Sequence, residues 1–480
     1  MQIISRYSSL DPALYHQQMP SPLIGAKAGH FNSALAEQLQ WSEEEKNQWV
    51  EICSGQKTFT AFHPLAMVYA GHQFGQWAGQ LGDGRGLLIA QVLDRNNQVV
   101  DLHLKGAGKT PYSRMGDGRA VLRSVIREYL AGHALNALGI PSSDAVGFTA
   151  STQPVQREKL ETAAMMLRSS DCHIRLGHFE WINQYAPELL KDFVDQCIAW
   201  HYPDCLHAAN PVLAFAEQVI QRTAVMIAKW QLYGFAHGVM NTDNLNITGS
   251  TLDFGPYGFM ERFRPNWINN HSDHHGRYSY QQQPSIGHWN LWVWINNLIP
   301  LASEANKDTF KHDLAQCLSH FETTFLEHYR LGLCEKMGLP AFHHDSFDCA
   351  MAFLKILQTE QLDYSQSFIR LQHQQYTALR DDCLDLRAFD QFLEHYHQIR
   401  HHQDTAELDA RMQHVNPRYI LRNHMAQTAI ERAEHGDFSE VDRLFELLSQ
   451  PYSPQPQREH PQDLAPLPND VPDVMVSCSS

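Results

Sequence analysis

Oxygen-bearing side chains gather in the middle of the chain, where Asp243 and Asn244 are followed after a short interval by Asp253. Carboxylate and carboxamide oxygens are the ligands that Mg²⁺ and Mn²⁺ prefer in proteins. A metal ion held by such oxygens could neutralise the charge of a nucleotide phosphate during group transfer. Asn244 and Asp253 are therefore candidate ligands for Mg²⁺ or Mn²⁺, and Asp243 is a candidate proton acceptor beside them.

The spacing of these residues matches a kinase pattern in part. In protein kinases a histidine is followed two residues later by the catalytic aspartate and seven residues later by a metal-binding asparagine, with an Asp-Phe-Gly triplet further on. Here Asn244 lies seven residues after His237, and Asp253 begins the triplet. Val239 stands where the kinase base would be, and valine cannot accept a proton. Asp243 is the nearby carboxylate that could replace that base.

A glycine-rich loop and a lysine could hold the phosphates. Gly82 and Gly84 precede Arg85, and backbone N–H groups without a Cβ beside them can approach a phosphate closely. A tight turn would use the same glycines, so the cluster alone does not distinguish a phosphate-binding loop from a plain turn. Lys105 ends a strand-like segment and resembles the strand lysine of kinases. Glu128 lies at the edge of an apolar helix face, where burial requires a partner, and we predict that it pairs with Lys105.

Two arginines and a turn complete the candidate nucleotide contacts. Arg168 and Arg175 are seven residues apart, so they share one face if their segment is helical. Guanidinium groups bind phosphates through paired hydrogen bonds, although surface ion pairs are the commoner use of such residues. Asp117 and Gly118 could contact a phosphate, the ribose or the base, or Asp117 could cap the helix that follows.

Regular elements must position these residues. Apolar and alternating segments predict strands at 87–93 and 99–105, and helical spacing predicts helices at 119–138 and 212–233. A small hairpin is expected at 245–253. The order, a small β-rich lobe with one helix followed by a larger helical lobe, indicates an α+β, protein-kinase-like two-lobed fold.

Composition shifts along the chain suggest five regions. The last of them contains seven prolines and cannot form a core of its own. The expected regions are an N-terminal wrap at 1–60, a kinase-like N-lobe at 61–165, a catalytic C-lobe at 166–300, a helical C-lobe extension at 301–450, and a flexible proline-rich tail at 451–480.

The overall charge limits the partners. With 37 Lys and Arg against 53 Asp and Glu, the chain of 480 residues has a net charge of −16. Nucleic acids and membrane surfaces are polyanionic, so neither is expected as a partner. The nine cysteines include no CxxC pair and suit a reducing compartment. The first residues do not show the basic start and apolar run that are typical of a signal peptide. We therefore expect a cytoplasmic protein.

Longer strings extend the comparison beyond kinases. They are YAGHQFG at 69–75, QLGDGR at 80–85, LKGAG at 104–108, TPYSR at 110–114, FAHGVMNTDN at 235–244, NHSD at 270–273, GRY at 276–278 and the terminal CSS at 478–480. Through these strings the chain resembles, over essentially its whole length, the selenoprotein O family of pseudokinase-fold protein adenylyltransferases.

The resemblance implies transfer of AMP from ATP to hydroxyl side chains of proteins, which can include the enzyme itself, with the nucleotide inverted relative to kinases. It implies that Asp243 accepts the proton, that Asn244 and Asp253 bind Mg²⁺ or Mn²⁺, and that Glu128 supports the lysine. The implied nucleotide contacts are Gly82, Gly84, Arg85, Lys105, Asp117, Gly118, Arg168, Arg175 and Asp253.

Two questions stay open from the sequence. An atypical kinase that transfers the γ-phosphate and a nucleotide-binding pseudokinase scaffold are alternatives to AMP transfer. Cys478 stands where some relatives have selenocysteine and is the candidate redox residue. The position where some bacterial relatives have a partner cysteine is Asn269 here, so the sequence does not identify a disulfide partner.

Overall fold

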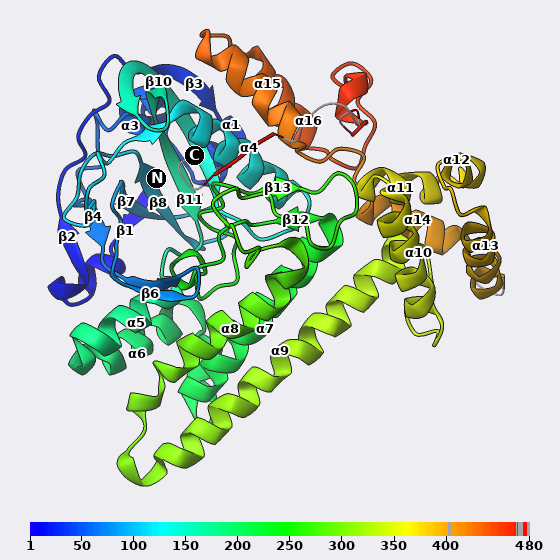
Figure 1. Ribbon diagram of the computed structural model, residues 1–480. Helices are drawn as coiled ribbons and strands as arrows, with labels where there is room; N and C mark the ends of the chain where they lie inside the picture. Colours follow the sequence, from blue (N-terminus) through cyan, green and yellow to red (C-terminus); the bar gives the residue numbers. More distant parts are fainter. Residues whose placement is uncertain (402–404, 467, 469–473, 478–480) are drawn as a thin grey trace.

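The computed structural model describes residues 1–401, 405–466, 468 and 474–477. It combines a large β-sheet with many helices (Figure 1), which agrees with the α+β class expected from the sequence. Among the described residues, no helix is both long enough and apolar enough to cross a lipid bilayer.

In the described part of the chain, nine antiparallel strands form the main sheet, in the order β2-β4-β7-β8-β11-β10-β3 with β1 beside β7 and β9 beside β11. The two predicted strands, β7 and β8, pair in its centre. Leu88 faces one apolar cluster, whereas Leu87 and Ile89 face another, because alternate side chains point to opposite faces. The bounds are β1 Gln2–Ile4, β2 Tyr15–Gln17, β3 Lys27–Phe31, β4 Leu65–Met67, β7 Gly86–Leu93, β8 Val99–Lys105, β9 Ala120–Val121, β10 Asp144–Gln156 and β11 Leu160–Ser170.

The N-terminal 60 residues are more regular than expected. They supply β1, β2 and β3 to the sheet and three short helices, α1 Ser33–Gln38, α2 Glu43–Asn47 and α3 Trp49–Cys53. Ser42 and Glu45 form a capping box that begins α2, and the backbone leaves helical geometry at Gln48, which separates α2 from α3. Helices α1 and α3 pack against β10 of the sheet.

Helix α4, Leu122–Ala137, packs against β10 and β11 and carries Glu128. It begins later than the predicted 119–138, because Ala120 and Val121 pair with β11 as strand β9. Gly139 follows its end with φ +76, a left-handed conformation that glycine adopts at no steric cost.

Five helices form the helical part that lies below the sheet in Figure 1: α5 Leu176–Tyr185, α6 Leu190–His201, α7 Pro211–Tyr233, α8 Gln283–Asn296 and α9 Lys307–Lys336. Asn210 caps the start of α7 by accepting a hydrogen bond from the backbone of Leu213, and Gly234 ends the helix at φ +68, as its sequence predicts. Between α7 and α8 lie two short strands, β12 Phe235–Ala236 and β13 Gly258–Phe259. Instead of the hairpin expected at 245–253, an isolated bridge joins Leu245 and Thr251.

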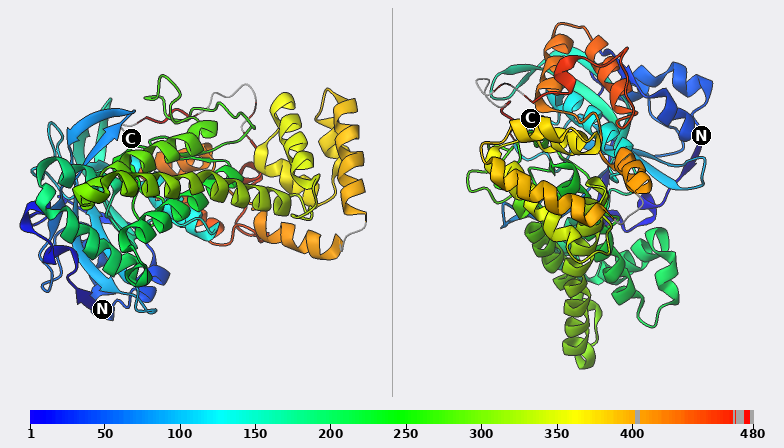
Figure 2. Two further views of the ribbon diagram at one scale, coloured as in Figure 1. Left: turned by 90° about the horizontal axis from the view of Figure 1, so that it is seen from below. Right: turned by 90° about the vertical axis from the view of Figure 1, so that its right-hand side faces the viewer.

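The helices after α9 form two groups. Helices α10 to α14 share an apolar cluster of their own and lie at the far end of α9 from the sheet (Figure 2), whereas α15 and α16 pack against α4. Their bounds are α10 Ser346–Glu360, α11 Tyr364–Gln372, α12 Tyr376–Asp381, α13 Leu386–Arg400, α14 Thr405–Val415, α15 Asn423–Glu434 and α16 Ser439–Leu448.

The first part of the expected tail is packed rather than free. The main-chain oxygen of Pro451 accepts hydrogen bonds from residues 418 and 419, and buried Asp463 pairs with Arg443 at 2.7 Å. The prediction of a flexible segment from 451 is therefore wrong for this stretch, since backbone hydrogen bonds, the ion pair and the packing of Tyr452 and Leu464 against the main apolar cluster hold it in place. Further on, Val476 forms a bridge with Asn270, and Cys478 lies outside the described residues.

The packing of α16 on α4 predicts a stability effect. Leu444 is fully buried in the apolar cluster that contains α4, so Leu444→Ala should lower the free energy of unfolding by about 2–5 kcal/mol. Leu326→Ala, at a side chain 46% exposed on α9, should change it by less than about 0.5 kcal/mol. Urea unfolding followed by circular dichroism measures both, and equal effects would contradict the assigned packing.

Candidate active site

A cavity of about 550 Å³ lies between the sheet and the helical part. Strand β8, the loop before β7, the end of β11 and the segment 239–256 surround it. It brings together every predicted nucleotide, metal and proton-accepting residue: Gly82, Gly84, Arg85, Lys105, Asp117, Gly118, Arg168, Arg175, Asp243, Asn244 and Asp253.

Glu128 joins the two cations that line the upper wall of this cavity. Its carboxylate accepts a hydrogen bond from Lys105 Nζ, and Arg168 Nε donates to its other oxygen at 2.9 Å. All three side chains are buried. Burial alone would raise the pKa of Glu128, but the charges of Arg168 and Lys105 hold it below its ordinary value. The predicted ion pair is present, and Arg168 makes it a triad.

Asp253 joins the same network from the other side. Arg168 Nη2 donates to its Oδ1 at 2.6 Å, and Arg175 Nη1 pairs with its Oδ2. Burial opposes ionisation of Asp253, yet both arginines and Lys105 hold its pKa well below the usual range. Its φ of +56 is costly for a residue with a Cβ, and these ion pairs hold the carboxylate in place.

The arginines converge, but not by the route that spacing suggested. The condition for a shared helix face, a helical segment from 168 to 175, is not met: Arg168 lies in β11, and Arg175 precedes α5 as its N-cap residue. The chain turns between them, so that both side chains reach Asp253. Convergence here comes from tertiary structure.

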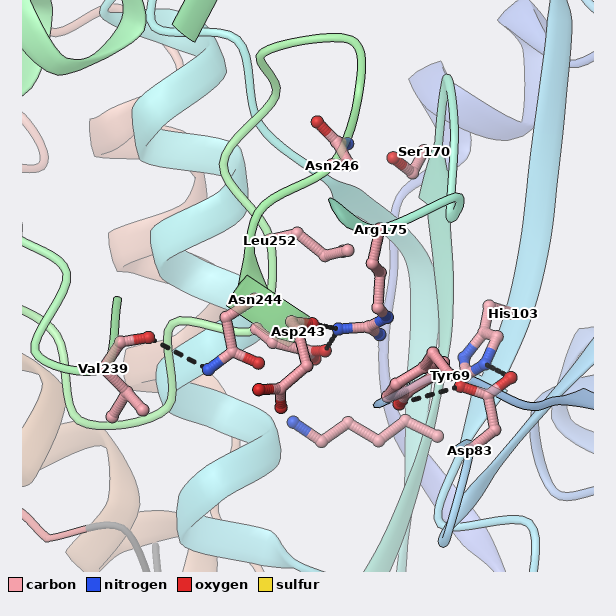
Figure 3. Close-up of polar contacts among 12 residues, drawn as sticks. Tyr69, Asp83, His103, Ser170, Arg175, Val239, Asp243, Asn244, Asn246 and Leu252 are labelled. Carbon is pink, nitrogen blue, oxygen red and sulfur yellow. Dashed lines mark hydrogen bonds and ion pairs between the residues drawn. The ribbon is translucent and has the colours of Figure 1, made fainter. Parts of the chain in front are cut away.

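Asp243 and Asn244 lie side by side near Arg175 in the cavity (Figure 3). Asn244 Nδ2 donates to the main-chain oxygen of Val239 at 2.9 Å, and this contact is compatible with metal binding through the amide oxygen. Asp243 is 6% exposed, and burial raises its pKa to about 6, although the hydrogen bond from Gln73 and the charge of Arg175 act in the opposite direction.

The donor set fits a hard divalent cation. Asn244 supplies an amide oxygen and Asp253 a carboxylate beside the same cavity, and these are ligand types that Mg²⁺ and Mn²⁺ accept. The carboxylate of Asp253 is shared with Arg168 and Arg175, so metal binding there requires that those arginines find another anion.

The glycine loop depends on a residue that the sequence analysis did not single out. Asp83 accepts hydrogen bonds from the backbone of Met67 and the hydroxyl of Tyr69, and it lies 3.3 Å from His103 Nε2 (Figure 3). Gly82 has φ +143, and a Cβ there would lie 2.5 Å from the ring of Tyr112. Asp83 therefore fixes the glycine loop through its contacts with Met67, Tyr69 and His103.

Asp117 and Gly118 form a turn rather than a helix cap. Asp117 accepts from the backbone of Arg119 at 2.9 Å and pairs with Arg157 at 2.8 Å, whereas the N-cap residue of α4 is Val121. Gly118 has φ +74, and a Cβ there would lie 2.1 Å from the backbone of Gly108. The N-cap interpretation is thus wrong, and the turn lines the cavity.

Comparison with known proteins identifies the family. A family model described as "Protein adenylyltransferase SelO" matches residues 2–449. The chain belongs to this family. It is 42% identical over 475 residues to "Protein nucleotidyltransferase YdiU" of Vibrio parahaemolyticus, covering 96% of this chain and 95% of the relative. The protein of the same description from Pseudomonas fluorescens is 44% identical over 462 residues, covering 94% and 93%.

Membership confirms the resemblance drawn from the motifs and makes the chain a nucleotidyltransferase. Two of the strings that carried the resemblance lie at the cavity. QLGDGR holds the loop anchored by Asp83, and YAGHQFG contains Gln73, whose amide contacts Asp243 at 3.1 Å. No local pattern distinguishes Gln73 within this second string, and the string itself was the signal in the sequence that could have pointed to it.

The buried triad predicts a large cost for one substitution. Glu128→Gln leaves Lys105 and Arg168 partly unpaired, and breaking a buried ion pair in this way should lower the free energy of unfolding by about 3–5 kcal/mol. In contrast, Asp195→Asn removes the exposed partner of Lys191 and should cost less than about 0.5 kcal/mol. Thermal and urea unfolding test this, and a cost for Glu128→Gln as small as that of the control would show that the triad contributes nothing to folding.

Proposed function

We propose that this chain is a metal-dependent enzyme that transfers AMP from ATP to serine, threonine or tyrosine hydroxyls of proteins. The family match makes nucleotidyl transfer the established class. One observation carries the proposal for this chain: three buried cations, Lys105, Arg168 and Arg175, line the same cavity as the buried carboxylate of Asp243. A triphosphate and a proton acceptor can therefore meet there.

The proposed architecture is a kinase-like pair of lobes with the nucleotide between them. In this arrangement the sheet with α4 is the N-lobe and the helical part from α5 onward is the C-lobe. The nucleotide contacts would be Gly82, Gly84, Arg85, Lys105, Asp117, Gly118, Arg168 and Arg175. Their convergence on one cavity supports this assignment. The nucleotide would lie inverted relative to kinases, with its α-phosphate nearest Asp243.

The chemical step is a displacement at the α-phosphorus. The acceptor hydroxyl oxygen forms a bond to that phosphorus, the bond to the bridging oxygen of the pyrophosphate breaks, and pyrophosphate leaves. Asp243 takes the proton of the hydroxyl, and its carboxylate is buried in the cleft, where a general base can be positioned in advance. Lys105, Arg168 and Arg175 offset the charge of the phosphates. A divalent ion held by Asn244 and Asp253 would supply further neutralisation.

Asp253 would exchange partners when ATP binds. Its carboxylate is paired with Arg168 and Arg175, which are also the proposed phosphate contacts. A triphosphate would draw the two guanidinium groups toward its own oxygens, and the carboxylate would become available to the metal. This exchange explains how one residue can serve both the nucleotide and the metal.

The location and partners are part of the same proposal. A net charge of −16 disfavours nucleic acids and membrane surfaces as partners, so we assign ATP and acceptor proteins as the partners and the cytoplasm as the site of action. The cysteines of the described residues are free thiols, which suits that compartment. A redox role of Cys478 stays a prediction.

Labelled ATP separates the proposal from its alternatives. With ATP labelled at the α-phosphate, label should appear on protein, and with γ-labelled ATP it should not. Asp243→Asn should reduce α-label transfer by about 100- to 10,000-fold, the usual contribution of a general base. Transfer of the γ-label would identify an atypical kinase, and binding of ATP without transfer to any acceptor protein would favour the pseudokinase scaffold.

Removal of the metal gives an independent prediction. Excess EDTA should abolish label transfer, and Mg²⁺ or Mn²⁺ added back should restore it, because the triphosphate charge needs a divalent ion as well as the three cations. Asp253→Ala should not be restored by either ion at concentrations that saturate the unchanged enzyme. Full transfer in the presence of EDTA would contradict the assigned metal role of Asn244 and Asp253.

A further inference from the structure

A small hairpin reaches from the sheet side onto the segment that carries Asp243. It consists of β5 Ala70–Gln73 and β6 Gln76–Gln80, pairs outside the main sheet, and lies between the sheet and α5 in Figure 1. The backbone N–H of His72 donates to Thr242 Oγ1 at 2.8 Å, and that of Phe74 donates to Asn241 Oδ1 at 3.2 Å. The hairpin is therefore hydrogen-bonded to the two residues just before Asp243.

Between these two contacts, Gln73 reaches Asp243 itself. Its Nε2 donates to Asp243 Oδ2 at 3.1 Å. The other carboxylate oxygen, Oδ1, has no contact with solvent and no hydrogen-bond partner. Hydrogen bonds to a charged group are stronger than those between neutral groups, so this single bond is a strong constraint on how the carboxylate is turned.

Glycines make the close approach possible. A Cβ on Gly71 would lie 2.6 Å from Asp243 Oδ1, and a Cβ on Gly177 would lie 2.1 Å from the main-chain oxygen of Ala70. Real Cβ atoms do not approach so closely, so bare backbone is required where the hairpin meets α5 and Asp243. The Asp243 carboxylate therefore packs against the backbone of Gly71 and accepts a hydrogen bond from Gln73.

The hairpin is itself fixed from several sides. His72 Nδ1 lies 2.6 Å from Glu180 Oε2, and the backbone of Phe74 donates to the hydroxyl of Tyr278 at 2.8 Å. These contacts hold the backbone at Gln73 in place while its side chain donates to Asp243. A donor on a rigid support can hold a reactive group in one orientation.

We propose that Gln73 is a positioning residue for AMP transfer, which turns the carboxylate of Asp243 so that Oδ2 meets the acceptor hydroxyl. Because Oδ1 is shut off from solvent against Gly71, an acceptor can reach only Oδ2 in this arrangement. Oδ2 has two lone pairs: Gln73 takes one, and the other receives the proton. The inference rests on the proposed function, since it assigns a partner to the base of that reaction.

The test compares two glutamines of one hairpin. Gln73→Leu removes the donor to Asp243, whereas Gln80→Leu removes the contact with Trp181 and leaves Asp243 untouched. Gln73→Leu should lower kcat for α-label transfer by about 10- to 100-fold, the equivalent of one hydrogen bond to a charged group, with KM for ATP and the melting temperature within error of the unchanged enzyme. Gln80→Leu should keep kcat.

Two more variants sharpen the result. Gln73→Glu puts a second carboxylate beside Asp243 and should lower kcat at least as far as Gln73→Leu, whereas Gln73→His retains an N–H donor and should recover part of the loss. An unchanged kcat in Gln73→Leu, an equal loss in Gln80→Leu, or a loss that appears only in KM for ATP would each overturn the proposal, because each would assign the hairpin a docking or nucleotide-binding role.

A structural measurement keeps this test apart from the proposed function. If the unchanged enzyme transfers γ-label or no label, the AMP-transfer proposal fails by itself. A crystal structure of Gln73→Leu then decides the positioning role: the Asp243 carboxylate should leave its place against Gly71 or become disordered. A carboxylate that stays in the same orientation would overturn the proposal whatever reaction the enzyme performs.

Discussion

The pairing of four buried ionised groups with a fifth at the cavity surface is the constraint on which the rest of the structure depends. Lys105, Arg168 and Arg175 are buried cations, and the anions that compensate them are the buried Glu128 and the partly exposed Asp253. Charges of this kind are costly to bury unless each is paired. Strands β8 and β11, helix α4, the start of α5 and the Asp-Phe-Gly segment each contribute one of these groups, so the fold must bring all five together correctly.

The same arrangement explains how an acidic chain can bind a triphosphate. A net charge of −16 repels polyanions on average, but the paired cations form a local site where anions can exchange. Glu128 keeps Lys105 and Arg168 oriented, while Asp253 holds the position that a phosphate would take over. Its left-handed backbone at φ +56 places the carboxylate between the two arginines and the cavity. In the proposed function, the pairing would hold the place of the nucleotide as well as support the fold.

Local patterns predicted part of this site, and tertiary structure decided the rest. The pairing of Lys105 with Glu128 followed from a lysine at a strand end and a carboxylate at the edge of an apolar helix face. The spacing of Arg168 and Arg175 would have placed them on one face only in a helix, whereas one residue lies in a strand and the other precedes a helix. The contact of Gln73 with Asp243 depends on a hairpin that crosses between distant parts of the chain, and no local pattern encodes it. Transfer of AMP and transfer of phosphate use the same residue types, so only the family match separated them.

The central claim is that the cleft presents the α-phosphate of ATP, rather than its γ-phosphate, to an acceptor beside Asp243. The most direct measurement is the identity of the small product released as protein becomes modified, with the mass added to the protein recorded in parallel. The account predicts one pyrophosphate per modified site and a mass increase equal to an AMP group. Release of ADP with a mass increase equal to a phosphate group would contradict it.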